Sequence, residues 1–185
     1  MSMKRKTVLT LAVIAIALSF FVTPVGYWSK VWLMQIFASA PEIIKEPNQD
    51  KITGYDWRLK DADWNYFNFE KSKGKPVFIH FWASWHLPSV SELADIQKLY
   101  EKFSEDVDFY VVTNEEREPV EEFMLENKFT FPITYRIVGE PAPLEIPEPS
   151  GTYIIDGQRR IAVKSVKNKD WYNDEIVSLL AKLTQ

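Results

Sequence analysis

Three polar residues at the start of an expected helix could do chemistry, namely His86, Ser89 and Glu92, which follow one another at intervals of three. They come after an apolar stretch over residues 77–82 that is typical of a buried strand. Pro88 favours the first turn of a helix, because its missing N–H costs no hydrogen bond there. The amide groups of a first turn stabilise an anion and disfavour a cation. We therefore expect a neutral His86, able to act as a base or a ligand.

Two kinds of site could be built on His86, but the sequence does not show all the residues that either site would need. A Ser–His hydrolase needs a third group that orients the imidazole and an oxyanion pocket, and the sequence shows neither at a readable spacing. A metal site would recruit His80, Glu92 or Asp95, but His80 lies inside the expected strand, where a core role is more common. A His86-centred enzyme or a metal- or haem-binding protein remains the alternative hypothesis for this chain.

The residues around His86 and Ser89 resemble a known motif. Phe81-Trp82-Ala83-Ser84-Trp85-His86-Leu87-Pro88-Ser89 resembles the Phe-Trp-Ala-x-Trp-Cys-x-Pro-Cys signature of the thioredoxin superfamily, specifically its membrane-anchored TlpA-like and ResA-like thiol-disulfide oxidoreductases. His86 stands where that family has its attacking cysteine, and Ser89 stands where it has the resolving one. Glu92 matches the family's glutamate three residues after the second cysteine. The resemblance covers roughly residues 55–183.

The resemblance implies a thioredoxin-like fold and a degenerate active site. It also implies a cis-proline loop that lays a substrate backbone beside the site. Ser150 aligns with the cis-proline and Pro149 lies one residue early, so either Pro149 is the cis residue or the groove has lost its proline. The degenerate positions are Trp85, His86, Leu87, Pro88, Ser89, Glu92, Pro149 and Ser150.

The composition excludes several classes of function. The chain has no cysteine, which rules out disulfides, cysteine-ligated metal and every thiol-based mechanism. We therefore expect a redox-inactive protein, and we predict no cofactor and no metal. Four of the 22 basic residues precede Glu42 and none of the 26 acidic ones does, so the remainder is more acidic than the net charge of −4 suggests. Such a surface repels phosphate backbones and argues against nucleic-acid binding.

The order of elements predicts an α/β domain with a central mixed sheet flanked by helices. Residues 77–82 are apolar on both faces, which is typical of a central strand in a sheet covered by helices on each side. On the helix from Pro88, Glu92 is expected to lie mostly away from the apolar stripe. Residues 130–135 lead into a long connection. Further strands are expected over residues 55–60, 65–69, 107–112, 152–156 and 161–165, and further helices from Pro119 to Asn127 and from about Asn173.

The N-terminal segment predicts a membrane anchor. Lys4, Arg5 and Lys6 precede an apolar run over residues 7–23 that reaches a comfortable spanning length if it continues to Trp28. The positive-inside rule places the basic end in the cytoplasm and the domain on the extracytoplasmic, periplasmic side. A cleaved signal peptide ending near residues 38–40 is the competing interpretation. Beyond Pro24, the chain forms either a short interfacial helix or the bent end of the spanning helix.

These patterns divide the chain into a cytoplasmic N-terminus and transmembrane helix over residues 1–28, an interfacial segment and linker over 29–53, and a thioredoxin-like domain over 54–185. From residue 41 the linker is expected to be a polar tether. The proline-rich segment over residues 141–149 either stiffens a rim that binds a partner or only stabilises the connection. We predict a membrane-anchored binding or scaffolding module with a protein partner at the groove of the former active site.

Overall fold

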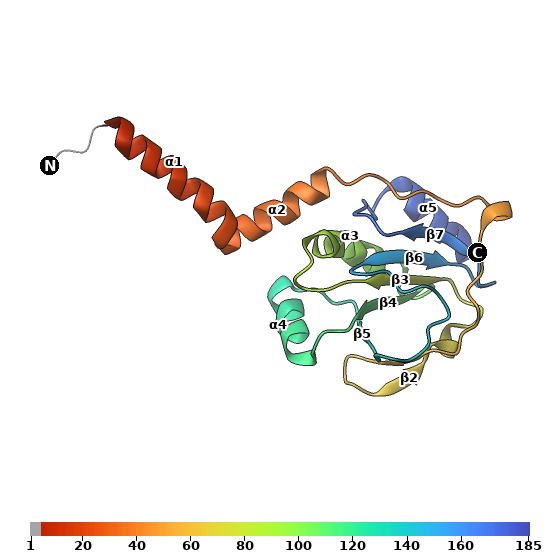
Figure 1. Cartoon of the computed structure of the whole chain (residues 1–185). Coiled ribbons are helices and arrows are strands. Elements are labelled where there is room, and N and C mark those ends of the chain that lie inside the picture. Colours follow the sequence, from red (N-terminus) through yellow and green to blue (C-terminus); the bar gives the residue numbers. More distant parts are fainter. Residues whose placement is uncertain (1–4) are drawn as a thin grey trace.

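The computed structural model describes residues 5–185 and places a seven-stranded mixed sheet at the centre of the molecule (Figure 1). The strands lie in the order β2-β1-β5-β4-β3-β6-β7. The three central neighbours β3, β4 and β5 are parallel, and every other pair is antiparallel. The strands are β1 Arg58–Lys60, β2 Tyr66–Asn68, β3 Val77–Phe81, β4 Asp108–Thr113, β5 Ile133–Arg136, β6 Gly151–Ile155 and β7 Ile161–Ser165.

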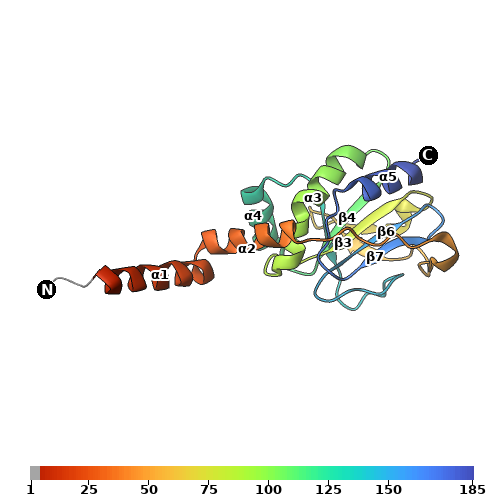
Figure 2. The same ribbon diagram turned by 90° about the horizontal axis from the view of Figure 1, so that it is seen from above.

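Three helices cover one face of this sheet (Figure 2). They are α3 Leu87–Phe103, α4 Arg117–Asn127 and α5 Asp174–Leu183. Their apolar stripes pack with Phe78, Ile154 and Trp171 in one core cluster. A second cluster on the opposite face contains no residue of these helices. Residues of the 3-10 helix η2 Phe69–Ser72 and of loops close it instead. The predicted thioredoxin-like α/β architecture with a central mixed sheet and flanking helices is confirmed, but the expectation of helices on each side of the sheet is wrong, because η2 and loops cover the second face.

Most element boundaries fall close to those expected from the sequence. The helix expected from Pro119 begins two residues earlier, at Arg117, because a proline within the first turn leaves no hydrogen bond unmade. The first two strands are shorter than expected. The second ends at Asn68 because the side chain of this residue accepts the amide of Glu70 and starts η2. The stretch expected to lead into a long connection includes β5, which pairs with both β4 and β1.

Two helices precede the domain; the second packs against α3, and the first projects away from the domain (Figure 1). They are α1 Arg5–Val22 and α2 Pro24–Ile36, with Thr23 capping the second. Among the described residues, no single helix is long and apolar enough to cross a bilayer. The two helices together pass by length and composition, but they are bent by 69° at their junction. The predicted single transmembrane helix is therefore not confirmed, and Lys4 of the basic cluster lies outside the described residues.

The segment expected to be a polar tether is attached to the sheet along much of its length. Isolated bridges join Ser39 to Lys169, Ile43 to Val163 and Lys51 to Arg160, so the chain follows the outer edge of β7. The segment also contains a short 3-10 helix, η1 Glu46–Asn48. Ile52 at its end is 2% exposed and belongs to the second core cluster. The division of the chain at residue 54 stays a prediction.

Candidate functional site

The candidate site lies where β3 ends and α3 begins. His86 is the N-cap of α3, with extended backbone angles, and Leu87 is the first helical residue, one position before the expected start at Pro88. A proline in the first turn donates no hydrogen bond, and none is needed there. The turn over residues 82–86, called the site turn below, therefore presents its side chains at the carboxyl end of a central strand, beside the first-turn amides of α3.

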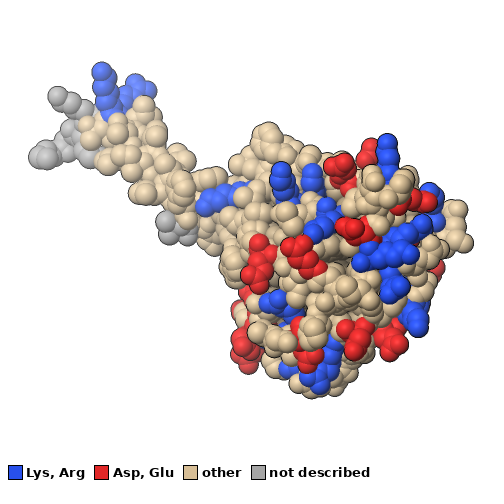
Figure 3. Space-filling view, turned by 45° about the vertical axis from the view of Figure 1, so that its right-hand side comes forward, with Lys and Arg blue, Asp and Glu red and all other residues tan. Residues whose placement is uncertain are grey.

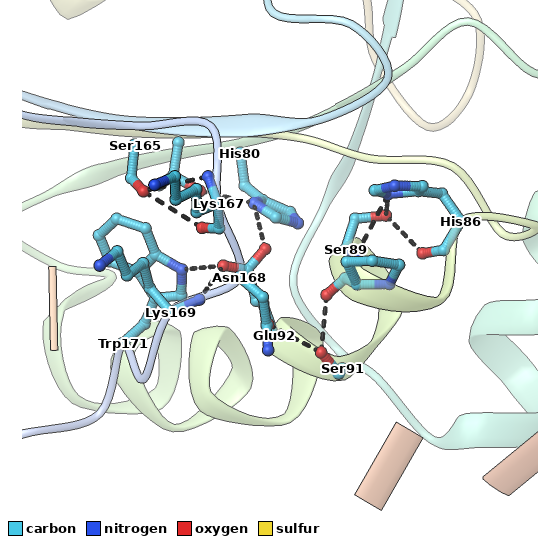
Figure 4. Close-up of polar contacts among 12 residues, drawn as sticks. His80, His86, Ser89, Ser91, Glu92, Ser165, Lys167, Asn168, Lys169 and Trp171 are labelled. Carbon is cyan, nitrogen blue, oxygen red and sulfur yellow. Dashed lines mark hydrogen bonds and ion pairs between the residues drawn. The ribbon is translucent and has the colours of Figure 1, made fainter. Parts of the chain in front are cut away.

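The structure brings His86 and Ser89 together (Figure 4). Nδ1 of His86 lies 3.2 Å from Oγ of Ser89 and accepts the backbone N–H of Ser89 at 3.4 Å. Because a backbone amide can only donate, Nδ1 carries no proton. Partial burial lowers the pKa of His86, so the imidazole is neutral near pH 7. The side chain acts as a helix cap at the position where the resemblance expects an attacking cysteine.

Ser89 has no access to solvent. The residue is fully buried, and its hydroxyl lies 2.9 Å from the carbonyl oxygen of His86. The backbone amide of Ala83 lies 3.4 Å from the same hydroxyl. A nucleophile must reach its substrate, so this geometry gives no support to a hydrolase that uses Ser89.

Glu115 holds the site turn from the neighbouring strand. One oxygen of its carboxylate accepts the backbone N–H of Ser84 at 2.7 Å, and the other accepts the hydroxyl of Ser84 at 2.7 Å. No pattern in the sequence singled out Glu115 as a site residue. Its only signal is its place just after β4, because the carboxyl ends of parallel strands meet at one edge of a sheet.

Glu92 lies inside the domain, which corrects the expectation that it faces away from the apolar stripe of its helix. It is 3% exposed, and Oε1 accepts the indole N–H of Trp171 at 2.7 Å and the backbone N–H of Lys169 at 2.9 Å (Figure 4). Both partners come from the loop that leads to α5. That loop covers the second turn of α3, so a position that the helical pattern marks as polar becomes buried.

His80 lies beside Glu92 on the same face of the sheet. Its Nδ1 is 2.8 Å from the hydroxyl of Thr152 and 3.9 Å from Oε2 of Glu92. Burial lowers the pKa of His80 to about 3 and raises the pKa of Glu92 to about 8. Near pH 7 both groups are therefore neutral, and the 3.9 Å contact is not an ion pair. His80 is a buried core residue, as its place in the strand suggested.

No group of three or more potential metal ligands forms among residues 5–185. His80 is buried behind α3, whereas His86 is the last residue of the site turn, so the two histidines lie in different environments. Asp95 pairs with Lys98 on α3 at 2.9 Å. The geometry thus adds no support to the metal- or haem-binding alternative.

A cleft runs between the site turn and the proline-rich segment. It encloses about 390 Å³, and its lining includes Ala83, Trp85, Arg136, Pro147 and Pro149. The peptide bond between Glu148 and Pro149 is cis, so Pro149 is the cis residue and the groove keeps its proline. Ser150, the other candidate for that position, is buried just before β6. Trp85 stands at the rim with 67% of its surface exposed.

Charged side chains are mixed over the domain surface seen in Figure 3, with both signs interspersed. The N-terminal projection differs, since its visible charges are basic and most of its surface is uncharged. The domain surface in this view thus offers no large patch of one sign that would attract an oppositely charged polymer.

Comparisons with known proteins agree with this geometry. The model of the AhpC/TSA family matches residues 52–163. "Thiol-disulfide oxidoreductase ResA" of Bacillus cereus is 26% identical over 163 residues, covering 86% of this chain and 84% of the relative. "Sporulation thiol-disulfide oxidoreductase A" of Bacillus subtilis is 35% identical over 74 residues, which are 37% of this chain and 45% of that protein.

Solved structures show the same fold. A DsbF homologue from Corynebacterium diphtheriae has a TM-score of 0.61 at 15% identity, covering 76% of this chain and 93% of that one. A secreted thiol-disulfide isomerase from Corynebacterium glutamicum has a TM-score of 0.62 at 15% identity, covering 79% and 92%. The chain therefore belongs to the AhpC/TSA family, with a thioredoxin-like fold, and it is a degenerate member without a cysteine.

Proposed function

We propose that this protein is a membrane-attached, redox-inactive thioredoxin-like module that binds a partner protein in the cleft beside its former active site. One observation carries the proposal. The cleft between the site turn and cis-Pro149 is open and rimmed by exposed Trp85, although the chain has no cysteine to use it for thiol exchange. The scaffold that would position a polypeptide is present without the reactive sulfur.

Thiol-disulfide exchange requires a thiolate that attacks sulfur and a second thiol that resolves the mixed disulfide. His86 and Ser89 can supply neither, since an imidazole forms no resolvable bond to sulfur and the Ser89 hydroxyl is buried. The relatives named as thiol-disulfide oxidoreductases therefore indicate the ancestry of this site rather than its present reaction.

The cleft has features that suit a polypeptide ligand. Exposed aromatic side chains at a cleft are typical anchors of protein interfaces, and Trp85 offers a large apolar surface at little cost in conformational entropy. Arg136 adds a single positive charge and several donors to the lining. Pro147 and Pro149 restrict the opposite wall, which lowers the entropy lost when a partner binds.

The proposal places the domain outside the cytoplasm. Arg5 and Lys6 lie at the start of α1, which exposes apolar side chains along its length, so the positive-inside rule leaves the domain on the far side of the membrane. One structural neighbour is described as secreted, which supports the same side. The bent pair α1 and α2 supplies enough apolar length for attachment.

Site-specific photocrosslinking tests the proposal. A photoreactive phenylalanine analogue replaces Trp85 in the full chain, and a matched variant carries it at Trp64, an exposed tryptophan outside the cleft. In membranes of the producing cell, we expect a protein adduct from position 85 and none from position 64. Absence of an adduct at both positions, or equal adducts at both, would count against the cleft as a binding site.

A second change separates this function from the alternative. His86→Ala removes the imidazole but leaves Trp85 and the proline-rich wall in place. We expect the adduct at position 85 to persist in this background. If it disappears while the domain stays folded by circular dichroism, the imidazole itself contacts the ligand and the His86-centred alternative gains support.

A further inference from the structure

The inner face of α2 is fastened to the site-bearing part of the domain. Val31 is 4% exposed and belongs to the core cluster that contains α3. The hydroxyl of Tyr27 donates to the carbonyl of Ser84 in the site turn at 3.2 Å, and Nε2 of Gln35 donates to the carbonyl of Ser91 in α3 at 2.9 Å. The position of α2 and that of the candidate site are therefore coupled by direct contacts.

The outer face of α2 is apolar and has no cover among the described residues. Val25, Trp28, Trp32 and Ile36 recur at helical spacing on one side, with 74%, 43%, 60% and 53% of their surfaces exposed. Lys30 is the only charged residue of this helix. The pattern inverts that of an ordinary surface helix, which turns its polar side outward. Exposed apolar patches of this kind mark a surface that something else covers.

The geometry of the two N-terminal helices indicates what covers it. The axis of α2 is turned 69° from that of α1, so if α1 follows the membrane normal, α2 lies close to the membrane plane. Tryptophan is enriched at the boundary between lipid and water, and a lysine beside it can extend toward the headgroups. Lys30 lies at the junction, with its Nζ 5.3 Å and 5.1 Å from the ring centroids of Phe20 and Phe21.

We propose that the outer face of α2 lies in the headgroup layer of the membrane that α1 enters, and that α2 thereby holds the site turn beside the bilayer. The inference rests on the proposed membrane attachment and names the surface that covers this helix, a lipid bilayer. The charge distribution supports it, because no acidic residue precedes Glu42 and the N-terminal projection shows only basic charges (Figure 3). The cleft then meets its partner close to the membrane surface.

The absence of native cysteine allows a direct test on the full chain. Single cysteines are introduced by Val25→Cys and Ile36→Cys on the outer face of α2, by Val13→Cys in α1, and by Glu118→Cys on the exposed side of α4 as the aqueous control. Each variant carries a nitroxide label and is reconstituted in vesicles of phosphatidylethanolamine and phosphatidylglycerol. Power saturation then compares collisions of the label with oxygen and with a water-soluble nickel complex.

We expect the oxygen-to-nickel accessibility ratio at positions 25 and 36 to exceed that at 118 by at least about threefold, with position 13 higher still. A ratio at 25 and 36 equal to that at 118, with 13 protected from nickel, would overturn the inference but leave membrane attachment intact. Aqueous values at all four positions would overturn both. Low collision rates with both reagents at 25 and 36 would show that protein covers this face, which also contradicts the inference.

Discussion

The imidazole of His86 has two effects on the candidate site. It caps α3 by accepting the amide of Ser89, and it removes the sulfur nucleophile that the sequence motif otherwise frames. The replacement keeps the helix start intact, because an unprotonated ring nitrogen can accept a first-turn N–H as a capping oxygen does. The site has therefore lost its reactive groups without losing its local geometry.

The double substitution His86→Cys with Ser89→Cys should restore thiol-disulfide exchange. The two positions are adjacent in space, and the first-turn amides of α3 remain available to lower the pKa of a thiolate at position 86. We expect measurable insulin reduction by the double variant and none by the natural chain. Each single variant serves as control, since one cysteine cannot form the internal disulfide. If thiol titration detects no disulfide in the oxidised double variant, the alignment of these positions with the family motif is wrong.

Glu92 should make stability fall as the pH rises. Its pKa is raised to about 8 in the folded protein, from an ordinary value near 4.5, mainly by burial. Between these values the folded state holds a proton that the unfolded state has lost, so the free energy of unfolding decreases with pH by up to about 1.4 kcal/mol per unit. Glu92→Gln keeps an oxygen for Trp171 and Lys169 but cannot ionise. We expect urea unfolding to show a stability that falls between pH 6.5 and 8 for the natural chain and a much flatter profile over that range for the variant.

The control for this experiment is Glu105→Gln, which changes an exposed carboxylate by the same atoms. Its pH profile should run parallel to that of the natural chain. A natural chain whose stability does not fall between pH 6.5 and 8 would contradict the assigned burial of a protonated Glu92. His80 opposes Glu92 below about pH 6.5, because it must gain a proton on unfolding and its pKa in the fold is about 3. Loss of stability below pH 6.5 is therefore expected in the Glu92→Gln variant, whereas the two effects offset each other in the natural chain down to about pH 4.5.

At the scale of elements, the site depends on three segments that are distant in sequence. Helix α3 begins at the cap formed by His86, Glu115 lies two residues after β4 and holds Ser84, and α2 contacts the same turn through Tyr27. These contacts meet at the turn over residues 82–86. A change in any of the three segments can therefore alter the shape of the cleft wall that carries Trp85.

Val31→Ala should loosen α2 without unfolding the sheet. The side chain is buried against the core, so its truncation should destabilise the docked helix by about 2 kcal/mol. Hydrogen exchange of the α2 amides should then be roughly thirtyfold faster, while the strands exchange as before. Val25→Ala is the matched control on the same helix, since Val25 is 74% exposed. Equal exchange in both variants would show that α2 is not held through Val31.

At the scale of the whole molecule, the domain uses more of the chain than its motifs suggest. Residues 39–52 follow the edge of β7, and Ile52 fills the second core cluster. An edge strand with unpaired backbone groups invites aggregation, and this segment covers part of that edge. The bridges also place Ser39, two residues after the C-cap of α2, beside Lys169, whose backbone N–H donates to Glu92.

Two truncated chains test how much the edge segment contributes. A chain that starts at residue 54 should be less stable than one that starts at residue 38 by at least about 2 kcal/mol, the value of burying one large aliphatic side chain such as Ile52. It also loses backbone hydrogen bonds such as that from Ile52 to Arg159. Urea unfolding followed by circular dichroism measures the difference. Equal midpoints would support a domain boundary at residue 54.

The residue pattern by itself determined the alternation of strands and helices, the start of α3 and the family of the chain. These properties are local, because the period of the apolar residues, the position of proline and the spacing of a motif can all be seen in consecutive residues. The absence of cysteine from the sequence also excludes thiol chemistry, whatever the fold. The capping role of His86 was not foreseen, although its neutral state was.

Only the tertiary structure decided which polar groups are buried. Glu92 becomes protonated because Trp171, from a distant loop, covers it, and Ser84 is held by Glu115 from the next strand. The structure likewise placed Pro149 in the cis form and turned Trp28 and Trp32 away from the domain. Burial and pKa depend on which residues meet across the fold, and a pattern along the chain does not contain those distances.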